Sequence, residues 1–142
     1  MNSKKIIFIV GPTAVGKTDI SLYLARHLGA EIVSCDAMQV YREISIASGK
    51  PSRQVLKMIP HHLVNVLSVR QTFNVARFNS LALKAMRSVQ RRGKMPIFVG
   101  GSGMYVEVLL DGIFQEGPKD ARLRRRLARR IETEGVQSVY EE

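Results

Sequence analysis

The sequence lacks the features of a membrane or secreted protein. No apolar run approaches the roughly 20 residues that a membrane-spanning helix needs, and the amino terminus has no apolar signal region followed by a small-residue cleavage site. The only cysteine, Cys35, has no partner for an internal disulfide, which suits a reducing compartment. We therefore expect a cytoplasmic protein that does not associate with a membrane.

Acidic residues are scarce as well. The chain has 12 Asp and Glu against 22 Lys and Arg, a net charge of +10 and an isoelectric point near 10.3. An enzyme that binds only small anionic metabolites does not require so high a positive charge. The charge therefore favours a polyanionic partner such as nucleic acid. The 142 residues, 45% of them hydrophobic, allow about one domain with its own core.

The clearest motif occupies residues 11–18, which read Gly-Pro-Thr-Ala-Val-Gly-Lys-Thr and fit G-x-x-x-x-G-K-[ST] at every fixed position. The apolar run 6–10 precedes it and the amphipathic segment 18–28 follows it, so strand, loop and helix occur in the order that the motif requires. We call residues 11–18 the phosphate loop. The loop predicts a di- or triphosphate site and leaves the reaction open.

The residue types of the phosphate loop explain this prediction. Gly11 and Gly16 let successive backbone N–H groups point at a phosphate, next to the positive end of the following helix. Lys17 adds a mobile charge, and the hydroxyl of Thr18 is placed to hold a Mg²⁺ ion that bridges phosphate oxygens. The predicted phosphate-binding residues are Gly11, Pro12, Thr13, Ala14, Val15, Gly16, Lys17 and Thr18.

Apolar runs and helical spacing predict an α/β fold. Unbroken apolar runs are typical of parallel strands that are covered on both faces. Strands are expected at 4–10, 31–35, 63–67 and 95–99, and helices at 18–28, 73–92 and 105–110, with loop and short helical turns between 37 and 60. We therefore expect a P-loop NTPase-like parallel sheet flanked by helices.

Asp36 is the only carboxylate predicted at the end of a strand. A P-loop ATPase or GTPase usually has an Asp at the end of another strand to hold Mg²⁺, and neither 63–67 nor 97–99 ends that way. Small-molecule kinases can place an acid after the second strand to take a proton from the acceptor, so Asp36 is predicted to be a general base. The stretch 36–42 is otherwise compatible with an ordinary surface turn.

Two further features near the predicted strand ends have alternative interpretations. Residues 100–103, Gly-Gly-Ser-Gly, form a second loop on the same edge, where Ser102 offers a hydroxyl, although a glycine turn without function is also possible. The pair His61 and His62 suits metal ligands or a structural role. The lack of Cys or carboxylate neighbours at ligand spacing favours the structural role.

The carboxyl-terminal part is strongly basic. Between 119 and 130 seven cations accompany a single acid, Asp120, while an apolar stripe keeps helical spacing. This pattern predicts an amphipathic helix whose arginines either coat a solvated face or contact phosphates. We expect a P-loop α/β core over residues 1–117 and the start of a basic helical insertion over 118–142.

Five blocks of the sequence together resemble the tRNA dimethylallyltransferases, also called tRNA isopentenyltransferases. Their order and spacing match over nearly the whole chain. The blocks are GPTAVGKT (11–18), EIVSCDAMQVYR (31–42), IPHHL (59–63), RGKMPI (92–97) and GGSGMY (100–105). The resemblance implies that the loop holds dimethylallyl diphosphate, whose five-carbon group passes to N6 of an adenosine next to the anticodon as diphosphate leaves.

The resemblance also implies roles for particular residues. Asp36, Lys17 and Ser102 would be catalytic, and Mg²⁺ would be the cofactor. The residues implied to contact the tRNA anticodon loop are Asp36, Ala37, Met38, Gln39, Ser102 and Arg124. Gln39 would read the edge of the adenine, and we expect a monomer.

The chain departs from the family pattern in residue types and in length. Ala37 stands where Ser is commoner, Cys35 where Ala or Gly is commoner, and Ser102 where Thr is commoner. Family members also run to about twice this length, so the chain resembles an amino-terminal part. We expect the chain alone to bind diphosphate and to transfer the prenyl group poorly or not at all.

Three alternatives remain open. A P-loop small-molecule kinase would use ATP, with Asp36 deprotonating a hydroxyl. An adenylate isopentenyltransferase would share the phosphate loop and Asp36 but act on a free nucleotide. A non-catalytic RNA-binding module would keep the loop only as a vestige, and the basic helix would carry its function.

Overall fold

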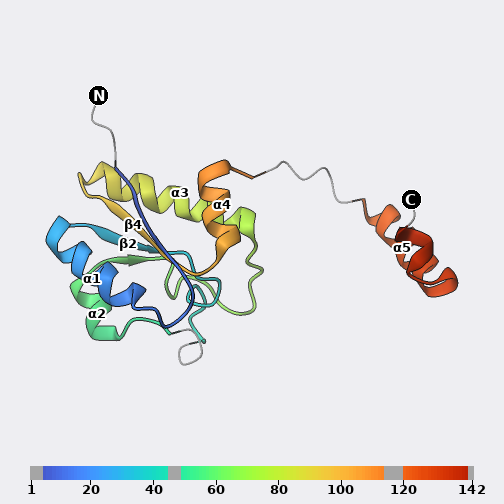
Figure 1. The fold of residues 1–142 in the computed structure, drawn as a ribbon, viewed down its shortest axis with the longest axis horizontal. Coiled ribbons are helices and arrows are strands. Elements are labelled where there is room, and N and C mark those ends of the chain that lie inside the picture. Colours follow the sequence, from blue (N-terminus) through green and yellow to red (C-terminus); the bar gives the residue numbers. More distant parts are fainter. Residues whose placement is uncertain (1–4, 45–48, 114–119, 141–142) are drawn as a thin grey trace.

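The computed structural model describes residues 5–44, 49–113 and 120–140 (Figure 1). Its helices and strands alternate over most of the chain. In chain order they are β1 (Ile7–Val10), α1 (Lys17–Leu28), β2 (Glu31–Ser34), α2 (Arg53–Met58), β3 (His61–His62), α3 (Val75–Arg91), β4 (Pro96–Gly100), α4 (Gly103–Asp111), α5 (Ala121–Glu134) and α6 (Gln137–Tyr140).

The four described strands form one parallel sheet in the order β1-β4-β2-β3. Both β1 and β2 pair with β4, and Ile97 of β4 lies opposite Ile7 on one side and Ile32 on the other. Because the strands are parallel, their carboxyl ends share one edge. The phosphate loop, Asp36 and the second glycine loop therefore all leave the sheet at this edge, and the predicted parallel α/β fold is confirmed.

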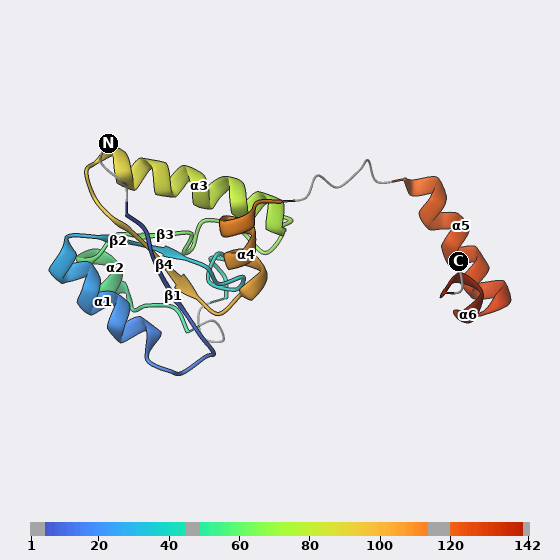
Figure 2. The ribbon, with the colours of Figure 1, turned by 45° about the horizontal axis from the view of Figure 1, so that its top comes forward.

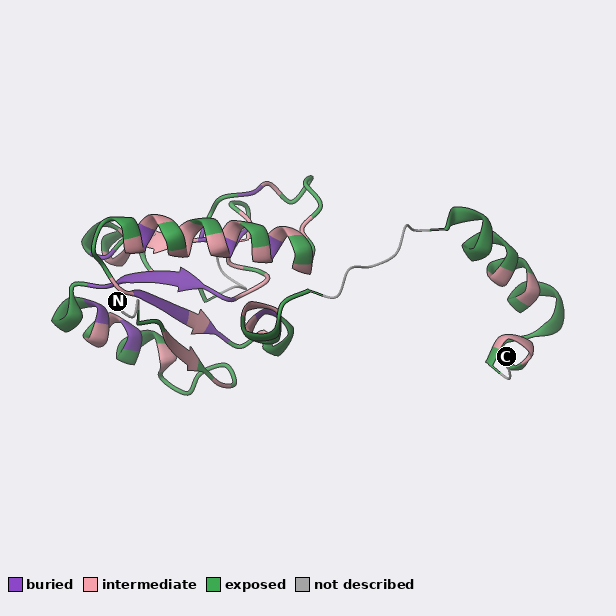
Figure 3. Cartoon of the chain, turned by 90° about the horizontal axis from the view of Figure 1, so that it is seen from above, coloured by how far each residue is buried: buried purple, intermediate pink, exposed green. Residues whose placement is uncertain are grey.

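Helices cover both faces of the sheet, with α1 and α2 on one side and α3 and α4 on the other (Figure 2). Each face has its own apolar core, because the residues of β2 and β4 alternate between the two sides. Figure 3 shows these two central strands as almost entirely buried. The core beside α1 and α2 contains Ala25, Ile32, Ile59 and Ile97, and the core beside α3 and α4 contains Val33, Phe78, Phe98 and Tyr105.

The predicted third strand is wrong in position. The observed strand is β3, His61–His62, and the apolar stretch 63–67 is largely irregular. Leu63 and Asn65 have φ angles of 62° and 56°, in the left-handed region, which a continuous strand does not allow. The stretch instead follows the loop after β2, where the N–H of Val66 donates to the carbonyl of Val40 at 2.9 Å. Leu63, Val64 and Leu67 are therefore buried beside a turn and do not belong to a regular strand.

A buried ion cluster lies at the opposite, amino-terminal edge of the sheet. The carboxylate of Glu31 is almost fully buried and contacts His62 Nε2 at 2.7 Å, Arg92 Nη2 at 2.6 Å and Lys94 Nζ at 3.2 Å. Burial raises the pKa of Glu31, but the hydrogen bonds from Arg92, His62 and Lys94 outweigh it and hold the pKa at about 2. The cluster joins β2, β3 and the turn before β4, so His62 has the structural role that the sequence favours.

Two helices at the carboxyl end pack on each other. Helix α5 begins after Asp120, whose carboxylate accepts hydrogen bonds from the N–H groups of Arg122 and Leu123. Helices α5 and α6 lie apart from the sheet in Figure 2. Lys119 and the expected boundary at 117–118 fall outside the described residues, so the division into two parts stays a prediction. None of the helices within the described ranges has the length and apolar character to span a bilayer.

We predict that replacing Glu31 by Gln lowers the free energy of unfolding at pH 7 by about 2–3 kcal/mol, because Arg92, Lys94 and His62 lose their charged partner. The carboxyl has a pKa of about 2 when folded and an ordinary value of 4.5, so its stabilisation is complete above pH 4.5 and is lost as the pH falls toward 2. Urea unfolding should therefore show a difference between wild type and variant that shrinks at pH 3. Glu132→Gln on exposed α5 is the control, and equal stability of Glu31→Gln and wild type at pH 7 would contradict the prediction.

Candidate active site

The phosphate loop has the backbone conformation of an anion-binding turn. Gly11 and Gly16 have φ angles of 156° and 85°, and Ala14 has 66°, so the chain reverses sharply between β1 and α1. No side chain caps the start of α1, which leaves the first N–H groups of the helix facing the loop. The ammonium group of Lys17 donates to the carbonyl of Pro12 at 2.5 Å. A phosphate in the loop would compete with this carbonyl for Lys17.

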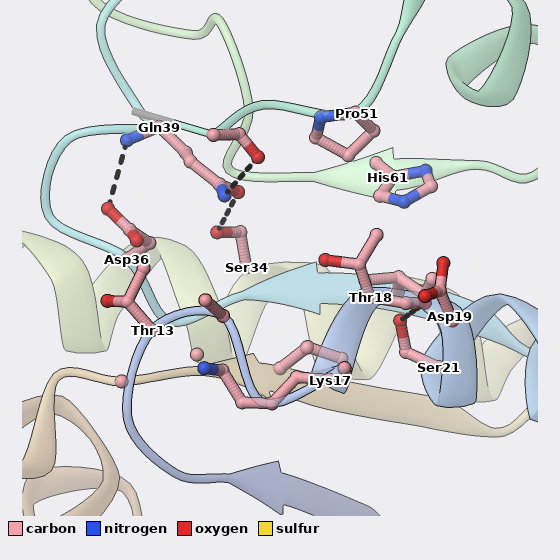
Figure 4. A pocket seen from close by; sticks show the side chains of 17 residues that line it. Thr13, Lys17, Thr18, Asp19, Ser21, Ser34, Asp36, Gln39, Pro51 and His61 are labelled. Carbon is pink, nitrogen blue, oxygen red and sulfur yellow. Dashed lines mark hydrogen bonds between the residues drawn. The ribbon is translucent and has the colours of Figure 1, made fainter. Parts of the chain in front are cut away.

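A pocket of about 460 Å³ opens beside the loop (Figure 4). Its lining comes from the loop itself, the start of α1, the end of β2, the segment before α2, β3 and the end of β4. The polar side chains that line it are Thr13, Lys17, Thr18, Asp19, Ser21, Ser34, Asp36, Gln39 and His61. The pocket therefore joins the phosphate loop to the residues that follow β2.

Asp36 stabilises the turn on which it lies. Its Oδ1 accepts hydrogen bonds from the N–H groups of Met38 at 2.8 Å and Gln39 at 3.3 Å. Its Oδ2 makes no hydrogen bond to any of the described residues. One carboxylate oxygen thus fixes the side chain, and the other remains for a ligand. This division suits a base that must stay oriented while it accepts a proton.

The irregular stretch 63–67 packs against this turn and is hydrogen-bonded to it. The N–H of Asn65 donates to the carbonyl of Gln39 at 3.0 Å. The guanidinium of Arg42 donates to the carbonyls of Asn65 at 3.1 Å and Val66 at 3.0 Å. The left-handed residues of the stretch let it follow the turn closely, which a regular strand would not do.

Close packing of two backbones places Asp36 beside the loop. A Cβ atom at Gly100 would lie 2.3 Å from the carbonyl oxygen of Cys35, and one at Gly101 would lie 3.1 Å from the carbonyl oxygen of Gly11. The N–H of Cys35 donates to the carbonyl of Val99 at 2.7 Å at the same point. The two glycines therefore let the end of β4 touch both the residue before Asp36 and the first residue of the phosphate loop.

We predict that Gly100→Ala destabilises the protein by about 1–3 kcal/mol, because the added methyl group overlaps the Cys35 carbonyl and forces β2 and β4 apart. Gly103→Ala is the matched control, since its Cβ would meet no heavy atom within 4 Å. Urea unfolding of the two variants measures the difference. Equal stability of Gly100→Ala and Gly103→Ala would show that the close approach does not constrain the fold.

His61 faces the pocket from β3 as a neutral imidazole. Its Nδ1 lies 2.7 Å from the carbonyl oxygen of Ile59, which only accepts, so Nδ1 is assigned the hydrogen. Burial lowers the pKa of His61, and neighbouring His62 lowers it further against the opposing effect of the Ile59 hydrogen bond. The described residues contain no group of three or more His, Cys, Asp or Glu that could hold a metal ion. A protein-held transition-metal site around these histidines is therefore not supported.

The oxygen atoms in the pocket suit Mg²⁺ better. This ion prefers oxygen ligands and is often held by one or two protein groups together with substrate phosphates and water. The pocket offers the hydroxyl of Thr18 and the carboxylate of Asp19. These residue types fit Mg²⁺, and its binding stays a prediction.

The structure brings only some of the predicted site residues into the pocket. Those that line it are Thr13, Ala14, Gly16, Lys17, Thr18, Asp36 and Gln39. The predicted residues that are not part of the lining are Gly11, Pro12, Val15, Ala37, Met38, Ser102 and Arg124. Ser102 precedes α4 next to the lining residue Gly101, and Arg124 lies on α5. Their binding and catalytic roles stay predictions.

Some lining residues are not predicted from the sequence. Ser34 is a buried polar residue at the end of an otherwise apolar strand, and that interruption is the signal that could single it out. Asp19 and Ser21 have the pattern of ordinary residues near the start of a helix. The orientation of His61 toward the pocket depends on the pairing of β3 with β2, which the sequence does not reveal.

The parallel sheet, its two helical layers and the pocket at the carboxyl edge define a P-loop NTPase-like α/β protein. The model of the IPP transferase family matches residues 39–142. The chain belongs to this family, as its resemblance to the tRNA dimethylallyltransferases implied. The phosphate loop precedes the matched region and is supported by its own conformation.

Similar proteins extend the match to nearly the whole chain. A tRNA dimethylallyltransferase of Thermotoga petrophila is 41% identical over 123 residues, which is 87% of this chain and 40% of that protein. The tRNA dimethylallyltransferase of Bacillus subtilis is 38% identical, over 99% of this chain and 46% of that protein. The crystal structure of the tRNA isopentenylpyrophosphate transferase of Bacillus halodurans superimposes with a TM-score of 0.76 at 36% identity, covering 97% of this chain and 46% of that one. The chain thus spans less than half the length of these relatives.

Proposed function

We propose that this chain carries the half of a tRNA dimethylallyltransferase site that binds the prenyl donor and activates the acceptor nucleobase. The observation that supports this most is that the phosphate loop and Asp36 line the same pocket. A group-transfer reaction needs a site for the leaving diphosphate next to a base that receives the proton of the nucleophile. The names of the relatives supply the donor and acceptor classes, a prenyl diphosphate and tRNA.

The phosphate loop would bind the diphosphate of the donor. As the C–O bond to the five-carbon group breaks, negative charge grows on the leaving diphosphate. The N–H groups at the start of α1 and the ammonium of Lys17 would stabilise that charge, with Lys17 moving from the Pro12 carbonyl to a phosphate oxygen. Mg²⁺, held by Thr18 and the phosphate oxygens, would supply further positive charge.

Asp36 would activate the acceptor. The exocyclic amine of adenine is a weak nucleophile, so removing its proton as it attacks lowers the barrier. Oδ1 of Asp36 stays bonded to the turn while Oδ2 accepts a proton from N6. A C–N bond forms, the C–O bond breaks, the proton moves to Asp36 and diphosphate leaves.

Helix α5 would contact the phosphates of the tRNA. A second hollow of about 480 Å³ is formed mainly by its arginines, and the residues that line it are Arg122, Arg125, Arg126, Arg129, Arg130, Thr133 and Glu134. Clustered arginines that face one hollow attract a polyanion, and the attraction weakens as salt is added. A eukaryotic dimethylallyltransferase acting on tRNA, 33% identical with a TM-score of 0.73 over 88% of this chain, supports tRNA as the polyanion.

We predict that Lys17→Ala lowers the affinity for pyrophosphate at least tenfold, whereas Asp36→Asn leaves it within about twofold, because Lys17 provides a positive charge to the phosphate and Asp36 does not. Isothermal titration calorimetry with Mg²⁺ and pyrophosphate measures both affinities. Dimethylallyl diphosphate should stabilise the wild-type chain against thermal unfolding at least as well as ATP. Stabilisation by ATP alone would favour a small-molecule kinase instead.

A charge reversal tests the role of α5. We predict that Arg124, Arg125 and Arg126 changed together to Glu weaken binding of an anticodon stem-loop and flatten the dependence of log affinity on log salt, by about one unit for each phosphate that the variant no longer neutralises. The control changes Lys84, Arg87 and Arg91 together to Glu on exposed positions of α3, which alters the net charge by the same amount. Equal weakening in the two variants would assign the RNA affinity to net charge alone.

A further inference from the structure

Three polar groups in the pocket have no protein partner. They are the hydroxyl of Thr18 and the carboxylate of Asp19, at the start of α1, and Nε2 of His61 on β3. No hydrogen bond or ion pair joins any of them to another residue in the described ranges. All three residues line the pocket, and Figure 4 shows His61 on β3 across from Thr18 and Asp19 on α1. These groups can therefore bind a ligand.

The free nitrogen of His61 is a hydrogen-bond acceptor. Nδ1 of His61 lies 2.7 Å from the carbonyl oxygen of Ile59, which cannot donate, so Nδ1 carries the hydrogen of the neutral ring. Nε2 is then left with its lone pair. The carboxylate of Asp19 also only accepts. This side of the pocket therefore requires a ligand that presents hydrogen-bond donors.

A diphosphate alone does not meet that requirement. Its oxygens are acceptors and it is negatively charged, so it would be repelled by Asp19 and could not bond to Nε2 of His61. A hydrated Mg²⁺ ion does meet the requirement, because its positive charge orients the hydrogens of its water ligands outward. Mg²⁺ also keeps several of its water molecules and prefers oxygen to nitrogen as a direct ligand.

We propose that Asp19 and His61 bind the Mg²⁺ ion of the donor complex through its water ligands. The carboxylate of Asp19 and Nε2 of His61 would each accept a hydrogen bond from a water molecule on the ion. This arrangement needs no cluster of protein ligands, and the described residues contain none. The inference rests on the proposed function, because the ion accompanies the diphosphate that the phosphate loop would bind.

The two residues should respond differently to the presence of the metal. Without Mg²⁺, the carboxylate of Asp19 repels a diphosphate in the same pocket, and with Mg²⁺ it stabilises the ion between them. The neutral ring of His61 contributes only when the hydrated ion is present. An acid at the start of a helix also stabilises the helix itself, and that effect does not depend on Mg²⁺.

Isothermal titration calorimetry with pyrophosphate, in excess Mg²⁺ and in EDTA, tests the role of Asp19. We expect Mg²⁺ to raise the affinity of the wild-type chain. Asp19→Asn should lower the affinity about tenfold in Mg²⁺, because it weakens a hydrogen bond to a charged group. In EDTA the same variant should bind pyrophosphate at least as tightly as the wild-type chain. Asp111→Asn, at an exposed position at the end of α4, is the control and should change neither affinity by more than about twofold.

Two substitutions of His61 separate the roles of its ring nitrogens. Asn can keep a donor toward the carbonyl of Ile59 but has no atom at the position of Nε2, whereas Gln reaches that position with an acceptor oxygen. In Mg²⁺ we expect His61→Asn to lower the affinity for pyrophosphate at least threefold, and His61→Gln to stay within about twofold of the wild-type chain. Both should keep the wild-type affinity in EDTA.

His27→Asn is the matched control for His61→Asn. Nδ1 of His27 likewise lies 2.9 Å from a backbone carbonyl oxygen, that of Tyr23, but His27 is exposed and does not line the pocket. This variant should change neither affinity.

The outcomes distinguish this inference from the proposed function. It is overturned if Asp19→Asn and His61→Asn keep the wild-type response to Mg²⁺, or if they weaken binding equally in Mg²⁺ and in EDTA, which would assign both residues to the fold. It is also overturned if the wild-type chain binds pyrophosphate equally in both conditions, and the transferase proposal then stands. If the wild-type chain binds no pyrophosphate in either condition, the proposed donor site is overturned and the inference fails with it.

Discussion

The close approach of the end of β4 to the residue before Asp36 is the constraint on which the site depends. Gly100 lies so close to the Cys35 carbonyl that no side chain fits between them. Gly101 lies near the first residue of the phosphate loop in a similar way. Because β4 is the strand between β1 and β2, these two approaches set the spacing between the phosphate loop and Asp36. The proposed transfer needs that spacing, since Asp36 must reach the acceptor amine while the phosphate loop holds the leaving group of the donor that the amine attacks.

The two edges of the sheet divide stability and function between them. At the amino edge the carboxylate of Glu31 contacts Arg92, Lys94 and His62, and its pKa of about 2 keeps it charged under ordinary conditions. At the carboxyl edge the polar groups of the described residues are only partly satisfied by the protein, as with Oδ2 of Asp36 and the uncapped start of α1. The ion cluster at the amino edge thus stabilises the strands. The carboxyl ends of the same strands carry polar groups that can form hydrogen bonds with a bound ligand.

The sequence predicted the parts of the fold that depend on local pattern. The phosphate loop, α1, β2 and β4 follow from apolar runs and glycine positions, and the structure has them within a few residues of the predicted bounds. The strand prediction at 63–67 is wrong because Leu63, Val64 and Leu67 are buried beside a neighbouring turn, and only the tertiary hydrogen bonds of the stretch to Gln39 and Val40 distinguish that from a strand. The sequence does not predict Ser34 as a site residue for a similar reason, because its hydrogen-bond partner Gln39 lies next to it only when the turn has formed.

The most direct test of the account is a crystal structure of the chain with Mg²⁺ and pyrophosphate. The account predicts that the anion lies in the turn formed by residues 11–18, that Lys17 leaves the Pro12 carbonyl for a phosphate oxygen, and that Asp36 keeps its bonds to Met38 and Gln39 with Oδ2 facing the same pocket. An anion bound elsewhere, or an Asp36 side chain turned out of the pocket when the loop is filled, would contradict it.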